Sequence, residues 1–166
     1  MSRPPHQVIY THGGGRLGNQ VIRFAHWMAW ARAHPGEIEV LNLAFWPHAD
    51  CFAAWRDRPG CVFPPRPGPA DSWARRRATL PRAVRAALEK NSRLARLVQR
   101  AATWLPGWQA EERDVLREES LDLDDPAWLA RVKRTRTTAC CGWKIASWRL
   151  VAEQERELRE HFRPAP

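Results

Sequence analysis

The sequence has few cysteines and no long apolar run, which argues against a structural zinc site and against a membrane-spanning helix. The four cysteines form no C-x-x-C pair, so we expect a reducing compartment and no structural zinc; they are Cys51, Cys61, Cys140 and Cys141. No stretch reaches the roughly 18 apolar residues that a membrane-spanning helix needs. We therefore expect a cytoplasmic protein, with peripheral association at the inner membrane kept as an alternative.

Motifs for metals and for the common nucleotides are also missing. No histidine lies at metal-ligand spacing from another, and there is no His-Glu-x-x-His arrangement; the six are His6, His12, His26, His34, His48 and His161. Gly13, Gly15 and Gly18 have Gly-x-Gly-x-x-Gly spacing, but the predicted second strand ends at Leu43 without an acidic ribose binder, and the chain has no P-loop Gly-Lys-Ser/Thr. We therefore expect no metal and no cofactor, and NAD and ATP are disfavoured as ligands.

What the chain does contain is enough apolar surface to fold. It has 166 residues, a hydrophobic fraction of 44% and 10 tryptophans, which indicates one folded domain. That length is short for an enzyme that binds both a nucleotide donor and an acceptor. The net charge of +9 is nearly all arginine, because only three of the 27 basic residues are lysine. A basic chain favours anionic partners.

Residues 1–43 predict a strand, a glycine-rich loop, a helix and a second strand. The apolar run Val8 to Thr11 is typical of a buried strand, and apolar residues recur at helical spacing from Asn19 or Gln20 to Ala33. A further strand is predicted over residues 37–43. A strand, a helix of crossover length and another strand form the beginning of a parallel α/β sheet, so we expect a Rossmann-like fold.

The rest of the chain divides into three segments. Residues 44–72 hold many prolines and predict a long loop, and residues 73–135 predict a helical insertion, basic and then acidic. A short helix is expected over 127–132, after Asp125 and Pro126. Residues 136–166 predict a strand over 137–141 and one helix over 147–162 with Ser147 as its N-cap.

The strongest helical periodicity covers residues 80–105, where the charge is concentrated. Between residues 73 and 105 there are nine basic residues and one acidic residue. Three interpretations stay open: a solvated face, a helix at a lipid interface aided by Trp73, Trp104 and Trp108, or a nucleic-acid patch, which is the least favoured.

The loop after the first strand has the chemistry of an anion site. Glycines let backbone amides approach a ligand closely, and a helix N-terminus offers unpaired N–H donors and a partial positive charge to a phosphate. Arg16 adds a forked cation and Asn19 adds an amide. The alternative is a turn that merely needs the glycines for its backbone conformation.

Within this loop, Gly15-Arg16-Leu17-Gly18-Asn19-Gln20 and the following helix with Phe24 and Ala25 resemble the first motif of the GDP-fucose-dependent fucosyltransferases. These include the α-1,2-fucosyltransferases and their protein O-fucosyltransferase and chitooligosaccharide fucosyltransferase relatives. The tract from Gly142-Trp143 to Phe162 is similar to the segment that ends the family's first half. The two tracts occur in the family's order.

The resemblance implies the amino-terminal half of a two-Rossmann-domain (GT-B) glycosyltransferase that inverts at the fucose carbon, with GDP-fucose as donor, a glycan as acceptor and no metal. The donor contacts that it implies are Gly14, Gly15, Arg16, Leu17, Gly18, Asn19 and Gln20.

The family's main donor motif, His-x-Arg-Arg-x-Asp, has no counterpart here, and the nearest fragment starts at His161. We therefore expect the second donor-binding domain to be absent and the chain to be inactive alone. His12 and Trp46, the latter near Trp55 in the proline-rich segment, are the candidate acceptor contacts. The catalytic base is unidentified. The competing function is a non-catalytic basic module that binds a membrane surface or nucleic acid through residues 80–105.

Overall fold

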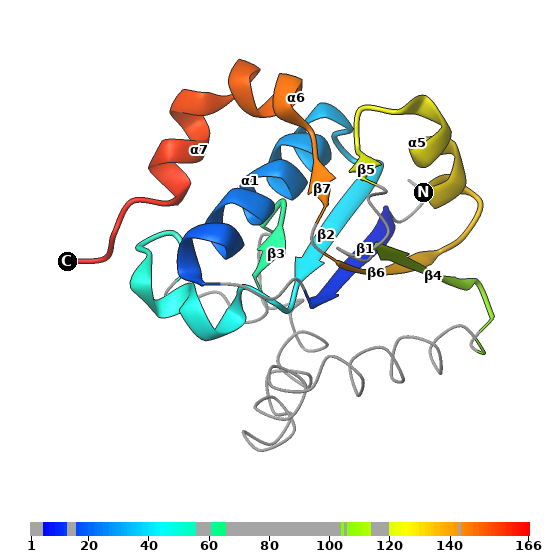
Figure 1. Ribbon diagram of the computed structural model, residues 1–166, viewed down its shortest axis with the longest axis horizontal. Coiled ribbons are helices and arrows are strands. Elements are labelled where there is room, and N and C mark those ends of the chain that lie inside the picture. The colour runs from blue at the N-terminus through cyan, green and yellow to red at the C-terminus, as the bar shows by residue number, and fades with distance from the viewer. Residues whose placement is uncertain are drawn as a thin grey trace.

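The protein has a mixed α/β architecture around a mostly parallel sheet (Figure 1). The computed structural model describes residues 5–12, 16–55, 61–65, 104, 106–113, 120–142 and 144–166. Within them, the larger sheet has the strand order β3-β2-β1-β6-β4, and β5 and β7 form a second, two-stranded sheet. The basic segment 80–105 lies outside the described residues except for Trp104.

The predicted strand-helix-strand unit is confirmed. Strand β1 (His6–His12) pairs in parallel with β2 (Ile38–Asn42), and helix α1 (Leu17–Ala33) connects them. Helix α1 begins two residues before the predicted Asn19, because the Arg16 carbonyl already accepts hydrogen bonds from the backbone N–H groups of Asn19 and Gln20, at 3.0 and 3.2 Å. Helix α1 therefore starts directly after Arg16.

Three more strands extend the sheet on both sides of this unit. The predicted third strand is confirmed as β6 (Thr137–Gly142), which lies parallel to β1, and β4 (Trp108–Arg113) continues the parallel sheet beyond it. On the other side, β3 (Val62–Phe63) pairs antiparallel with β2. The expectation that residues 73–135 form a helical insertion is wrong for Trp108–Arg113, which form β4. The charged sequence of this strand has no strand pattern, and its conformation is defined by pairing with β6.

Helices α1 and α5 pack on the same face of the sheet. Helix α5 (Pro126–Lys133) confirms the short helix expected here, and its N-cap Asp125 accepts a hydrogen bond from the Ala127 N–H at 2.8 Å. The Trp128 ring lies 6.5 Å from that of Trp27 and 6.1 Å from that of Trp30, and all three are fully buried. These rings fill the space between the two helices.

The prediction of one long loop over residues 44–72 is wrong in part, because this segment contains regular structure and packs through aromatic side chains on α1. The 3-10 helix η1 (Trp46–Cys51) and strand β3 both lie in that range. Proline at the start of η1 costs no hydrogen bond, because the first helical N–H groups have no partner within the helix. The Phe24 ring lies 4.9 Å from Phe45 and 4.8 Å from Trp55. This segment therefore covers one side of α1.

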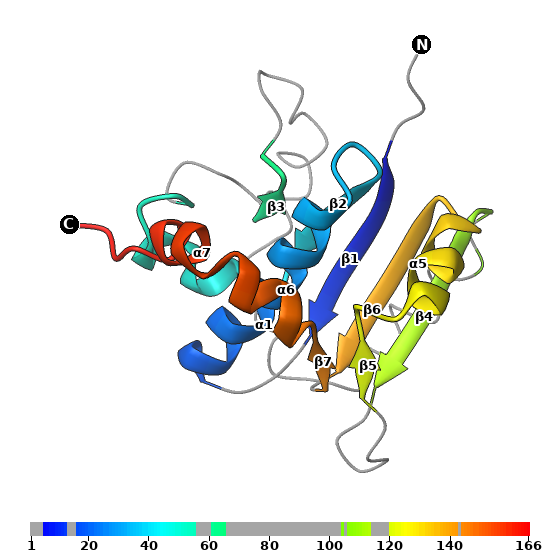
Figure 2. The ribbon, with the colours of Figure 1, turned by 90° about the horizontal axis from the view of Figure 1, so that it is seen from above.

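The single predicted C-terminal helix is two helices, α6 (Trp148–Glu153) and α7 (Glu155–His161), separated at Gln154. Ser147 precedes α6, but its side chain makes no capping hydrogen bond. Before α6, β7 (Ile145–Ala146) pairs in parallel with β5 (Leu121–Asp122), and neither strand was predicted. Figure 2 shows α6 beside α1 and directly after β7.

No helix in the described part of the chain is long and apolar enough to cross a membrane.

Candidate functional site: the start of helix α1 and the adjacent groove

The predicted loop residues that the structure describes lie at the exposed start of α1. Arg16, Leu17, Gly18 and Asn19 are all exposed, and Arg16 occupies the N-cap position without a side-chain capping bond. The first turn contains no acidic residue. Gly14 and Gly15 lie outside the described residues. The N–H groups of this turn are therefore not capped by a side chain of the described residues, and the helix dipole adds positive charge there.

Gly18 has no structural need to be glycine. A Cβ atom added at this position would meet no atom within 4 Å, and its backbone is helical rather than left-handed. The interpretation of the loop as a turn that merely requires positive φ does not apply to Gly18. Open space around the helix start would instead let a ligand approach the backbone.

Other predicted site residues are placed differently. Gln20 is only 5% exposed, so we leave it out of the ligand contacts. His12 ends β1 and Trp46 begins η1, but their side chains lie outside what the structure describes. Trp55 is fully buried against Phe24 and belongs to the core rather than to a cleft.

A groove of about 330 Å³ begins at Asn19 and runs between α1 and β7. We call it the α1–β7 groove. Its lining residues are Asn19, Ile22, Arg23, His26, Ser120, Lys144, Ile145, Ala146 and Trp148. None of these described lining residues is acidic, whereas Arg23 and Lys144 are cationic. The groove lies on the side of the sheet where β1 and β6 end, the side on which open α/β sheets bind ligands.

Arg23 connects the groove to the sheet through Tyr10. The Tyr10 hydroxyl donates to the Gly142 carbonyl at 2.6 Å and so joins the ends of β1 and β6. Arg23 forms a side-chain hydrogen bond with Tyr10, and both residues are buried. Burial raises the pKa of Tyr10 despite the opposing effect of Arg23. Tyr10 is therefore a neutral phenol, and the Arg23 guanidinium lies beside the groove.

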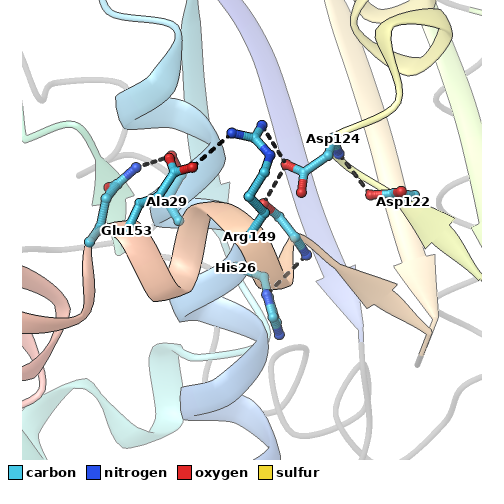
Figure 3. A network of polar contacts seen from close by, with 8 residues as sticks. His26, Ala29, Asp122, Asp124, Arg149 and Glu153 are labelled. Carbon is cyan, nitrogen blue, oxygen red and sulfur yellow. Dashed lines mark hydrogen bonds and ion pairs between the residues drawn. The ribbon is translucent and has the colours of Figure 1, made fainter.

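His26, Ser147 and Asp124 form a polar network at the other end of the groove (Figure 3). The Ser147 N–H donates to His26 Nδ1 at 3.0 Å, and the Ser147 hydroxyl donates to Asp124 at 2.7 Å. Burial lowers the pKa of His26, although the nearby Asp124 acts in the opposite direction. The ring is therefore neutral at pH 7 and carries its proton on Nε2, because Nδ1 accepts from Ser147.

These three residues have the types of a serine hydrolase triad but not its connections. In a triad the histidine accepts the serine hydroxyl proton and the carboxylate holds the histidine. Here the Ser147 hydroxyl donates to Asp124 and not to His26. The hydrogen bond between Ser147 and His26 comes from the Ser147 backbone N–H. The network therefore fixes the start of α6, and with it Trp148, and provides no activated nucleophile.

Sequence reasoning missed most of the groove. Arg23 and His26 follow Asn19 by four and seven residues, so helical spacing could have placed them on its face. Lys144 and Trp148 are more than 100 residues away in the sequence, and no local pattern connects them with α1. Only the pairing of β5 with β7 and the packing of α6 on α1 bring them to the groove.

Among the described residues, no group of three or more His, Cys, Asp or Glu side chains is placed to hold a metal ion. Comparison of the chain with protein-family models, with curated proteins and with solved structures found no match.

Proposed function

We propose that this chain supplies one wall of the donor site of a glycosyltransferase that uses a nucleotide-sugar, GDP-fucose being the donor that the sequence motif favours. In this proposal the chain corresponds to the first Rossmann-like half of a GT-B enzyme, and a glycan hydroxyl accepts the sugar with inversion. The observation that carries the proposal is the start of α1, where Arg16 is exposed, side-chain capping is absent and Gly18 faces open space.

The chemistry of each group fits a diphosphate. The Arg16 guanidinium can bind two phosphate oxygens at once, and the helix N–H groups add donors and a partial positive charge. In the transfer reaction the nucleoside diphosphate leaves with increased negative charge, which fixed donors of this kind stabilise. Asn19 lies in the first turn of α1 and also lines the α1–β7 groove. In this proposal its amide contacts both the donor and the acceptor.

The proposal is tested by measuring GDP binding by calorimetry and by the shift of the thermal midpoint. We expect GDP to bind and to stabilise the chain, whereas ATP and NAD do not. Arg16→Ala should weaken GDP binding about tenfold, which corresponds to about 1.4 kcal/mol, without a change in the thermal midpoint of the free protein. Arg16 is exposed and makes no side-chain cap, so its loss should not affect folding.

Arg134→Ala is the matched control. Arg134 is exposed and precedes β6, so it lies at the opposite edge of the sheet from the start of α1. Both variants lower the net charge of +9 by one. Equal weakening by the two variants would indicate nonspecific charge attraction and would refute a site at Arg16.

The competing function, a basic module for membrane surfaces or nucleic acid, depends on residues 80–105. It predicts no stabilisation by GDP. It also predicts binding to anionic vesicles or nucleic acid that fades as salt rises.

A further inference from the structure

One wall of the α1–β7 groove is a single face of helix α1, and the other wall is formed by residues 144–148. Asn19, Arg23 and His26 recur at the spacing of helical turns along α1, over about 10 Å at 1.5 Å per residue. The opposite wall is β7 with Lys144 before it and Trp148 after it. The volume of about 330 Å³ is that of a small-molecule pocket.

Trp148 is a large aromatic side chain that is exposed and yet held in place. It is 67% exposed, and its ring lies 4.4 Å from the His26 ring at an interplanar angle of 86°. The preceding residue, Ser147, is fixed by hydrogen bonds to His26 and Asp124. A fixed, exposed indole offers a flat apolar surface on which the C–H face of a sugar ring can pack.

The charged groups of the groove select the kind of sugar. Lys144 is held by its own backbone, because its carbonyl accepts a hydrogen bond from the Leu121 N–H at 2.6 Å. Arg23 adds a second positive charge, and no described lining residue is acidic. Positive charge along the groove favours an anionic group on the ligand.

We propose that the α1–β7 groove is an acceptor subsite for an acidic saccharide, in which the sugar ring packs on Trp148 and its carboxylate meets Lys144. This inference rests on the proposed function, since it names the acceptor class of that glycosyl transfer. The groove starts at Asn19, so a saccharide there lies next to the helix start that is proposed to hold the donor diphosphate. Donor and acceptor then occupy neighbouring sites and bind together.

The test compares two matched oligosaccharides by calorimetry with the full chain. One is a tetrasaccharide that alternates glucuronic acid and N-acetylglucosamine, and the other contains N-acetylglucosamine alone. We expect the acidic tetrasaccharide to bind about tenfold more tightly at low ionic strength, and the difference to shrink as salt screens the charges. Equal affinity for the two, or preference for the neutral one, would overturn the assignment of an acidic acceptor.

Variants assign the binding to the groove. Trp148→Ala should weaken both tetrasaccharides at least tenfold, while Trp148→Phe keeps most of the affinity because an aromatic face remains. Lys144→Gln should weaken binding of the acidic tetrasaccharide about tenfold and so remove the preference for it. Trp104→Ala is the control, since Trp104 is 88% exposed and does not line the groove. If Trp104→Ala weakens binding as much as Trp148→Ala does, binding is not in the groove and the proposal fails.

Titration of GDP into the same protein separates this inference from the proposed function. GDP binding without saccharide binding leaves the donor proposal intact and overturns the acceptor subsite. Saccharide binding without GDP binding supports a saccharide site and refutes the donor site. If GDP displaces the saccharide, the groove is occupied by the nucleoside and the acceptor subsite is refuted.

Discussion

Replacement of Gly18 by alanine separates a ligand-binding loop from a structural turn. Gly18 lies in the first turn of α1, and an added Cβ would meet no atom within 4 Å. Alanine is favoured over glycine in a helix by up to about 1 kcal/mol, and less in the first turn. For a chain of this size, 1 kcal/mol shifts the thermal midpoint by about 2–4 °C. We therefore expect the midpoint of Gly18→Ala to stay the same or to rise by up to about 3 °C, on that scale.

Binding should change in the opposite direction. If the backbone of the first turn approaches a diphosphate, a methyl group at residue 18 stands between the ligand and the N–H groups. Lengthening these hydrogen bonds should weaken GDP binding by about tenfold, or about 1.4 kcal/mol. A gain in folding stability together with a loss of affinity is a combination that a purely structural glycine cannot produce.

Calorimetric titration of GDP and thermal unfolding of the free protein measure the two quantities. Gly36→Ala is the control, because Gly36 follows α1 with φ of 74°, where a side chain is strained although space is open. That variant should lose about 1 kcal/mol of stability and bind GDP normally. The reasoning would be refuted if Gly18→Ala lowered the thermal midpoint and left GDP affinity unchanged.

Two further predictions concern stability. Asp125→Ala should lower the free energy of unfolding by about 1 kcal/mol because it removes the N-cap of α5, whereas Asp125→Asn should be nearly neutral in chemical denaturation; a similar loss in both variants would mean that charge rather than capping matters. Since burial lowers the pKa of His26, the unfolded chain binds its proton more readily, so stability should fall as the pH decreases from 7 through about 6.5, the ordinary value for histidine. His26→Asn keeps an acceptor for the Ser147 N–H and should unfold with a weaker pH dependence between 7 and 5; identical pH profiles would rule out this role of His26.

Local patterns identified the elements whose neighbours are close in the sequence. The apolar run from Val8 to Thr11 predicted β1, the helical spacing up to Ala33 predicted α1, and Asp125 followed by Pro126 predicted the start of α5. Each of these patterns depends only on residues close together in the sequence. Strand β4 was missed because its charged sequence lacks that pattern. Its Gln109 amide donates to the Thr138 hydroxyl at 2.7 Å, a contact that only the neighbouring strand provides.

The sequence by itself determined that a glycine-rich loop follows a buried strand and leads into a helix, because turns and helix starts depend on residues a few positions apart. It thereby indicated an anion site at Arg16 and its neighbours. Only the tertiary structure decided that a groove lined by Lys144 and Trp148 begins next to this helix start. These residues are placed there by the pairing of β7 with β5, which joins segments more than 20 residues apart, and by the packing of α6 on α1, which joins segments more than 100 residues apart. Such contacts form only when the whole core is assembled.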